Sequence, residues 1–173
     1  FTKHIDSANP VRFLIAECES AFILLAALYF ARRFGIEDVI DISPLLETPA
    51  ALEHGHLIVD DALSNPDYHA YIRARGRLCI QTGYSDAGRF MGQVPATLAI
   101  ERARIKLVDV LLRHGLGDVE VVIFDTHGES IGRGAHPDSF ADRMDYTYPA
   151  RCRAVFAGHG IDDLDTVTPE DLE

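Results

Sequence analysis

Residues 119–137 read VEVVIFDTHGESIGRGAHP, and their pattern decides the predicted fold. β-Branched and aromatic residues dominate the first part, which predicts a strand that is buried on both faces. The strand leads into a polar turn, where Gly128, Gly132 and Gly134 let the backbone approach a ligand closely. Arg133 lies between two of these glycines, so its guanidinium is well presented to grip a phosphate or carboxylate at two points. The alternative is a glycine-rich surface turn with a solvated arginine.

Similar apolar runs precede this stretch and alternate with helical patterns. Helix-end signals support the helices: Thr48 is suited to be an N-cap, Pro49 to be the first helical residue, and Gly35 to end the helix before it. Continuous apolar strands that alternate with helices predict an α/β fold with a parallel sheet. The predicted strands are residues 11–16, 39–46, 78–82 and 119–124, and the predicted helices are residues 17–34, 50–63, 67–75 and 95–114.

The pattern weakens after Pro137, where only short helices at residues 139–144 and 150–156 are predicted. We therefore expect residues 1–137 to form the segment with four strands and the site loops. Residues 138–173 are expected to form a helical or irregular extension of the same domain.

The composition narrows the possible partners. The chain has 173 residues and a net charge of −11, which disfavours nucleic acid and anionic membrane surfaces as partners. The longest apolar run, residues 21–31, is too short to span a bilayer. The three cysteines, Cys18, Cys79 and Cys152, form no metal-binding or disulfide pattern, which is typical of reduced thiols in a cytoplasmic protein.

Charged side chains follow each predicted strand. Glu17, Glu47 and Asp86 follow the first three strands, and the loop with Arg133 follows the fourth. Because ligands collect at the carboxyl ends of parallel strands, we expect these groups to share one edge of the sheet. Three carboxylates in one place favour a bound divalent cation, and Mg²⁺ or Mn²⁺ suits their hard oxygens. Each acid also has a simpler interpretation: Glu47 favours a helix N-terminus, Asp86 caps a helix, and Glu17 pairs with an arginine.

Three motifs resemble successive motifs of the phosphoenolpyruvate carboxylase family, in the same order and at similar spacing. They are Pro44-Leu45-Leu46-Glu47-Thr48, then Gly83-Tyr84-Ser85-Asp86, then Phe124 followed by Gly128-x-Ser130-Ile131-Gly132-Arg133-Gly134. The resemblance covers residues 11–137 and implies a segment of a (β/α)8 TIM-type barrel. It implies a magnesium- or manganese-dependent carboxylation of phosphoenolpyruvate by bicarbonate, which yields oxaloacetate and phosphate.

The resemblance also implies roles for individual residues. Glu47 and Asp86 match the two metal-ligand positions. Arg133, Arg89 and His127 fall at positions of catalytic residues, with Arg89 where the family usually has a lysine. Ser130, Gly132, Arg133 and Gly134 match the loop that binds the substrate. A complete barrel needs about 250 residues, so the resemblance implies that this chain works with the rest of a full-length protein, as a homo-oligomer.

The chain departs from the family pattern in its glycine-rich loop. Asp125 stands where the family has a histidine, His127 where it has an arginine, and Glu129 where it has a glycine. These changes remove positive charge from the expected site of an anionic substrate. Two alternatives therefore stay open: another magnesium-dependent barrel lyase or aldolase that acts on a phospho- or oxo-acid, and a degenerate barrel without catalysis.

Overall fold

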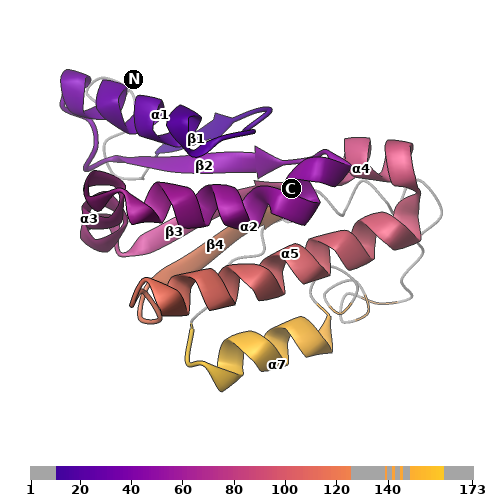
Figure 1. The fold of residues 1–173 in the computed structure, drawn as a ribbon. Coiled ribbons are helices and arrows are strands. Elements are labelled where there is room, and N and C mark those ends of the chain that lie inside the picture. Colours follow the sequence, from indigo (N-terminus) through magenta and orange to yellow (C-terminus); the bar gives the residue numbers. More distant parts are fainter. Residues whose placement is uncertain (1–10, 126–138, 140–141, 143–144, 146–148, 162–173) are drawn as a thin grey trace.

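The computed structural model describes residues 11–125, 139, 142, 145 and 149–161. In this part of the chain, parallel strands alternate with helices (Figure 1). The strands are β1 (Val11–Ile15), β2 (Ile40–Leu46), β3 (Arg77–Thr82) and β4 (Glu120–Asp125). The helices are α1 (Ala21–Phe34), α2 (Pro49–Ser64), α3 (Pro66–Arg75), α4 (Tyr84–Met91), α5 (Gln93–Arg113) and α7 (Ala150–Gly158).

The four strands form one parallel sheet in the order β1-β2-β3-β4, so each strand lies beside the strand that precedes it in the chain. Helices α2 and α5 run side by side along the sheet, and α7 lies against α5 (Figure 1). The predicted α/β class with parallel strands is therefore confirmed. A sequential strand order is compatible with part of a barrel.

The hydrophobic core lies between the sheet and these helices. Alternate strand residues face it, because successive side chains of a strand point to opposite faces. Gly55 lets α2 approach β2 closely, since a Cβ at this position would lie only 2.6 Å from Cδ1 of Leu46. The buried strand residues of the core include Ile42, Leu46, Leu78, Ile80, Val121 and Ile123.

The helix ends largely follow the sequence signals. The Thr48 side chain accepts a hydrogen bond from the backbone N–H of Ala51 at 3.0 Å, with Pro49 in the first turn, so the predicted start of α2 is confirmed. Gly35 ends α1 in the left-handed conformation, with φ of 62°. The predicted start of the first helix at residue 17 is wrong, because Glu17 has φ of 49° and Ser20 is extended.

Helix α4 is the main difference from the predicted elements. No helix is predicted between the strand that ends at residue 82 and the helix that begins at residue 95, but Tyr84 already lies in a helix whose N-cap is Gly83. Asp86 is therefore in the first turn of α4, and the interpretation that it is itself an N-cap is wrong. Glycines at residues 83, 88 and 92 hide this short helix from a propensity argument, because glycine disfavours helix.

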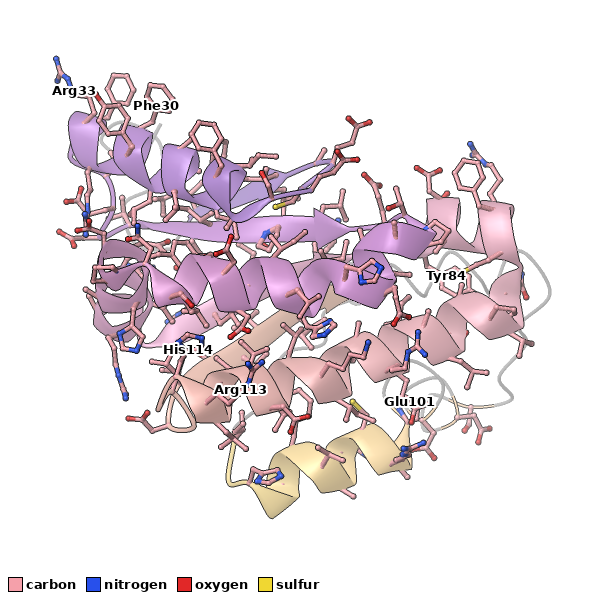
Figure 2. All side chains as sticks on the ribbon, viewed as in Figure 1. Phe30, Arg33, Tyr84, Glu101, Arg113 and His114 are labelled. Atoms are coloured by element: carbon pink, nitrogen blue, oxygen red, sulfur yellow. The ribbon has the colours of Figure 1, made fainter. Side chains whose placement is uncertain are left out.

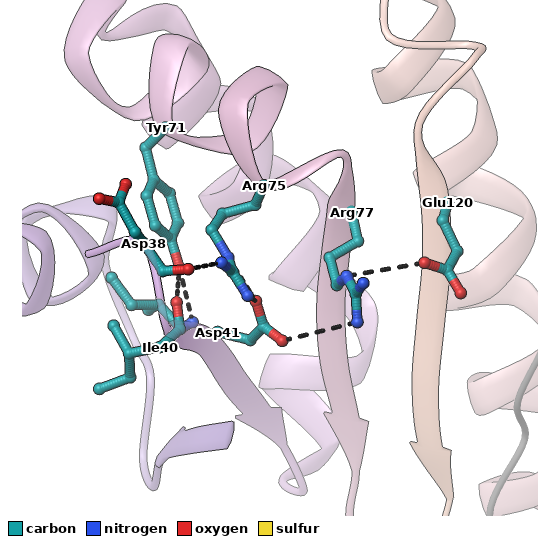
Figure 3. A network of polar contacts seen from close by, with 8 residues as sticks. Asp38, Ile40, Asp41, Tyr71, Arg75, Arg77 and Glu120 are labelled. Atoms are coloured by element: carbon teal, nitrogen blue, oxygen red, sulfur yellow. Dashed lines mark hydrogen bonds and ion pairs between the residues drawn. The ribbon is translucent and has the colours of Figure 1, made fainter. Parts of the chain in front are cut away.

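A polar network joins β2 to β3 where their backbones separate (Figure 3). These strands pair only near their carboxyl ends, through Leu45 with Gln81 and Leu46 with Thr82. Further back, the Tyr71 hydroxyl donates to the carbonyl of Ile40 at 2.7 Å and accepts from the N–H of Ile42 at 3.0 Å. The phenol thus satisfies backbone groups of β2 that β3 does not reach.

Charged side chains complete this network at the amino ends of the strands. Asp41 is buried and forms an ion pair with Arg75 at 2.7 Å, while Arg75 also donates to the carbonyl of Asp38. Arg77 lies 4.0 Å from Asp41 and 3.6 Å from Glu120 on the next strand (Figure 3). The amino ends of β2, β3 and β4 are therefore held together by charge as well as by backbone pairing.

A second polar cluster fastens α2 to the C-terminal end of α5, where Arg113 and His114 project (Figure 2). His114 Nε2 lies 2.8 Å from Asp60 Oδ1, and Arg113 donates to Asp60 at 3.0 Å. The hydrogen bond from His114 is the largest influence that lowers the pKa of Asp60.

No described helix is long and apolar enough to cross a membrane. All three cysteines are free thiols, as expected, and all three are buried.

Candidate active site at the carboxyl ends of the strands

Glu47 is placed by the junction between β2 and α2. It directly follows the last residue of β2 and precedes Thr48, whose side chain caps α2. The strand fixes the backbone on one side and the cap fixes it on the other, so the position of Glu47 is well determined. The side chain is half-buried at the carboxyl edge of the sheet.

Gly83 brings the end of β3 against this position. A Cβ at Gly83 would lie 2.4 Å from Cβ of Glu47, a separation that real Cβ atoms do not adopt. The N–H of Gly83 also donates to the carbonyl of Leu46 at 2.9 Å, which ties the two strand ends together. Glycine is thus required for the close approach of β3 to Glu47. Asp86 follows three residues later, in the first turn of α4.

Two neighbouring carboxylates act on Glu47 at this edge. Burial raises the pKa of Glu47, and the negative charges of Asp86 and Glu17 raise it further. The backbone N–H of Glu17 opposes this effect by donating a hydrogen bond to Glu47. Glu17 itself has φ of 49°, a left-handed backbone that non-glycine residues adopt rarely. The acids that follow the first three strands are therefore near neighbours. Glu17 lies beside carboxylates here, whereas the simpler interpretation paired it with an arginine.

Arg89 supplies positive charge beside the acids. It lies one turn after Asp86 on α4, with Nη1 at 3.6 Å from Oδ1 of Asp86. Both side chains are substantially exposed, at 66% for Arg89 and 40% for Asp86, so the ion pair is weakened by solvent. The structure thus brings together Glu47, Asp86 and Arg89 from the predicted site. The other predicted residues, His127, Ser130, Gly132, Arg133 and Gly134, lie outside the described residues.

The oxygen ligands at this edge fit a hard divalent cation. Glu47 and Asp86 come from two different elements, and the negative charge of Asp86 disfavours the charged form of Glu47 unless a cation lies near them. Among the described residues, no three His, Cys, Asp or Glu side chains form a complete metal cage. Mg²⁺ does not need one, because it commonly binds through one or two carboxylates and keeps several waters.

A cavity of about 410 Å³ lies nearby, but it does not contain the acids. Its lining comes from the start of α1 and the first turns of α2, and includes Cys18, Thr48, His54, Leu57 and Asp61. Neither Glu47 nor Asp86 lines it. Because strand ends and not helix faces collect catalytic groups in parallel α/β folds, the acidic edge is the better candidate site.

Two structural features of this site could not be predicted from the sequence: the contact between Gly83 and Glu47, and the left-handed backbone of Glu17. The requirement for Gly83 depends on the contact between two strand ends that are 36 residues apart in the chain, since Glu47 and Gly83 meet only in the folded sheet. The Gly-Tyr-Ser-Asp motif pointed to the region, but not to the backbone contact. The left-handed backbone of Glu17 could not be predicted, because glutamate rarely adopts a positive φ.

The described part of the chain is an α/β fold with an acidic edge at the carboxyl ends of sequentially ordered parallel strands. Comparison with known proteins identifies the group within this class. The sequence model of phosphoenolpyruvate carboxylase matches residues 5–141. The chain therefore belongs to the phosphoenolpyruvate carboxylase family.

Individual relatives agree with this family. A phosphoenolpyruvate carboxylase of Mycobacterium leprae (strain TN) is 31% identical over 140 residues, which cover 76% of this chain and 15% of that protein. The enzyme of that name from Xanthomonas campestris pv. campestris (strain 8004) is 33% identical over 128 residues, or 70% of this chain and 14% of that protein. The chain thus spans about one seventh of the length of these curated relatives.

Proposed function

We propose that this chain supplies the metal-binding corner of an enzyme that carboxylates phosphoenolpyruvate with bicarbonate and releases oxaloacetate and phosphate. The observation that carries the proposal is the convergence of Glu47 and Asp86 at adjacent strand ends, in a chain that belongs to the family. In this proposal the four strands are one part of a (β/α)8 barrel. Residues 1–137 form the barrel segment and residues 138–173 its extension, in a cytoplasmic homo-oligomer.

Glu47 and Asp86 would hold Mg²⁺ or Mn²⁺ through their carboxylate oxygens. When bound, such an ion stabilises negative charge on enolate and phosphate oxygens. The protein's part is to position the two carboxylates, which Gly83 and the Thr48 cap support from opposite sides. The raised pKa of Glu47 is consistent with this role, because a cation at the site would restore the charged form.

Arg89 would place a cation at the rim of the same site, next to Asp86. A guanidinium can bind two oxygens of a phosphate or carboxylate at once. We propose that Arg89 takes the part that a lysine has in the family. Arg133, His127 and Ser130, with Gly132 and Gly134, are proposed to complete the anion site from the loop after β4.

The test is carboxylation by the protein at its natural length, measured as incorporation of labelled bicarbonate into oxaloacetate with Mg²⁺ and phosphoenolpyruvate. Glu47→Gln should reduce turnover at least about 100-fold, since a charge-stabilising group at a reaction centre contributes about that much. Glu37→Gln is the matched control, because Glu37 precedes β2 and lies at the opposite end of the strand. Equal turnover of the wild type and Glu47→Gln would refute the assignment.

The same assay separates the alternatives. A different lyase of phospho- or oxo-acids would consume its substrate without any dependence on bicarbonate. A non-catalytic protein would bind Mg²⁺ through Glu47 and form no oxaloacetate. The substituted loop, with Asp125 and His127, is the feature of the sequence that favours this second alternative.

A further inference from the structure

The face of the sheet that lies away from the core helices carries polar side chains below the acidic edge. By the two-residue alternation of a strand, Ser43, Leu45 and Glu47 share one face of β2. Gln81 shares that face on β3, because it pairs directly with Leu45. The near contact between Gly83 and Glu47 supports this alignment at the rim. Gln81 and Ser43 therefore lie on the same surface as Glu47, successively farther from the strand ends.

Both polar side chains are buried, and each has an oxygen without a hydrogen-bond partner among the described residues. Ser43 is 1% exposed and Gln81 is 9% exposed. Ser43 Oγ and Gln81 Oε1 form no hydrogen bond within the part of the chain that the structure describes. Asp41, on the same face but near the amino end, is instead bound by Arg75. Buried polar atoms are nearly always hydrogen-bonded, and leaving one unpaired destabilises the fold.

We propose that the Gln81 carboxamide contacts the small anionic substrate that binds beside Glu47 and Asp86, with Ser43 deeper in the same site. The inference rests on the proposed function. Gln81 lies two residues before Gly83, about 7 Å along the strand, so its side chain can reach a ligand at the rim. The shared chemistry is a planar, anionic CO2 group, which is the carboxylate in phosphoenolpyruvate and part of the ion in bicarbonate.

An uncharged carboxamide suits this position for two reasons. It presents a donor and an acceptor that exchange places by a rotation of the amide, so it can meet a carboxylate oxygen or a protonated oxygen. It also adds no charge next to Glu47, where a further negative group would raise the pKa of the carboxyl still more. Gln81 is therefore proposed as a residue that orients the substrate, while the charged groups at the rim supply affinity.

The experiment compares the wild type at natural length with Gln81→Met, which keeps the length of the side chain and removes its polar atoms. We would measure the melting temperature without ligand, the dissociation constant of oxalate with Mg²⁺ by calorimetry, and kcat and KM for phosphoenolpyruvate and bicarbonate separately. Oxalate is the probe because it presents planar carboxylates without needing turnover. Ile80→Val is the control, since Ile80 is buried in the core on the other face of β3.

Gln81→Met should weaken oxalate binding by about tenfold or more, as expected when a hydrogen bond to a charged group is lost. Its ligand-free melting temperature should equal or exceed that of the wild type, because an unpaired buried group is removed. The KM that rises identifies the contacted substrate. Ile80→Val should lower the melting temperature and leave oxalate binding unchanged.

Oxalate binding equal to that of the wild type would overturn the role of Gln81, and so would a clear fall in melting temperature without a change in KM. If the wild type forms no oxaloacetate, the proposed function fails, and the oxalate measurement still decides the role of Gln81. A wild type that neither binds oxalate nor forms oxaloacetate overturns both.

Discussion

Gly83 and Glu47 meet at the carboxyl edge of the sheet, where a Cβ on the glycine would lie 2.4 Å from the Cβ of the glutamate. The contact joins the end of β3 to the end of β2. Glu47 itself is one proposed metal ligand, and Asp86, the other, follows Gly83 by three residues. It links packing to function, because the spacing of the strand ends sets the spacing of Glu47 and Asp86.

Gly83→Ala should therefore damage the site and the fold together. The added methyl group meets Cα of Glu47 at 3.2 Å as well as its Cβ, so backbone must move. We expect a loss of about 1–3 kcal/mol in the free energy of unfolding, typical of overpacking in a tight site, and a weaker response to Mg²⁺. Urea unfolding with and without Mg²⁺ measures both effects.

Gly88→Ala is the matched control for this substitution. Gly88 lies within α4, and its added Cβ would meet only the Tyr84 ring at 3.4 Å or more. Alanine favours helix over glycine by about 0.5–1 kcal/mol, so the control should be neutral or stabilising. If Gly83→Ala proves as well tolerated as Gly88→Ala, the strand ends do not depend on this contact.

Glu47→Gln should stabilise the metal-free protein at neutral pH. The pKa of Glu47 is raised from 4.5, so the folded state holds this proton more tightly than the unfolded state. The stability from this group is complete below the unfolded pKa and is lost as the pH rises through the folded pKa. Replacement by glutamine should remove that loss, with a gain below about 1 kcal/mol because the site is partly solvated.

The measurement is unfolding by urea at several values between about pH 4 and about pH 8, because the pKa of Glu47 is raised above its usual range. Wild-type stability should decline more steeply above pH 4.5 than that of Glu47→Gln. Added Mg²⁺ should stabilise the wild type and leave the variant unchanged. Identical pH profiles, or equal stabilisation by Mg²⁺, would contradict the prediction. Glu37→Gln serves again as the control.

Arg89 offers a test of the charge at the rim. Arg89→Lys keeps a cation near Asp86, whereas Arg89→Met removes it and keeps an apolar side chain of similar length. We expect Arg89→Met to raise the KM for phosphoenolpyruvate about tenfold or more, as for the loss of a hydrogen bond to a charged group, and Arg89→Lys to recover part of the affinity. Because the side chain is exposed, the melting temperature of both variants should stay near that of the wild type. A fall in kcat/KM of the same size in both variants would show that the charge alone is not what matters.

The sequence predicts the strands and their parallel arrangement well, because apolar runs and the Thr48, Pro49 and Gly35 signals are local. It also predicts that Glu47 and Asp86 share an edge, since that follows from the rule on carboxyl ends of parallel strands. Helix α4 is not predicted, because the glycines within it and at its ends weaken the helical pattern.

Contacts between distant segments could not be predicted in this way. The Tyr71 hydroxyl reaches backbone groups of Ile40 and Ile42, about thirty residues earlier, and no local pattern marks a phenol for that purpose. The burial of Gln81 Oε1 and Ser43 Oγ, which have no hydrogen-bond partner in the described part of the chain, likewise depends on strand register and on which face each side chain occupies. Register and facing are properties of the assembled sheet and not of any one strand.

Two buried tyrosines of α3 give the last prediction, because only one of them has partners for its hydroxyl. Tyr71 bridges Ile40 and Ile42 on β2, so Tyr71→Phe leaves a buried N–H and carbonyl unsatisfied and should cost about 1–3 kcal/mol of unfolding free energy. The Tyr68 hydroxyl has no hydrogen-bond partner among the described residues, so Tyr68→Phe should be neutral or slightly stabilising. Both rings keep their packing, so urea unfolding of the two variants isolates the value of the hydroxyl. If Tyr71→Phe were as neutral as Tyr68→Phe, the hydroxyl bridge between α3 and β2 would add nothing to stability, and the separated ends of β2 and β3 would be held by the Asp41–Arg75 ion pair instead.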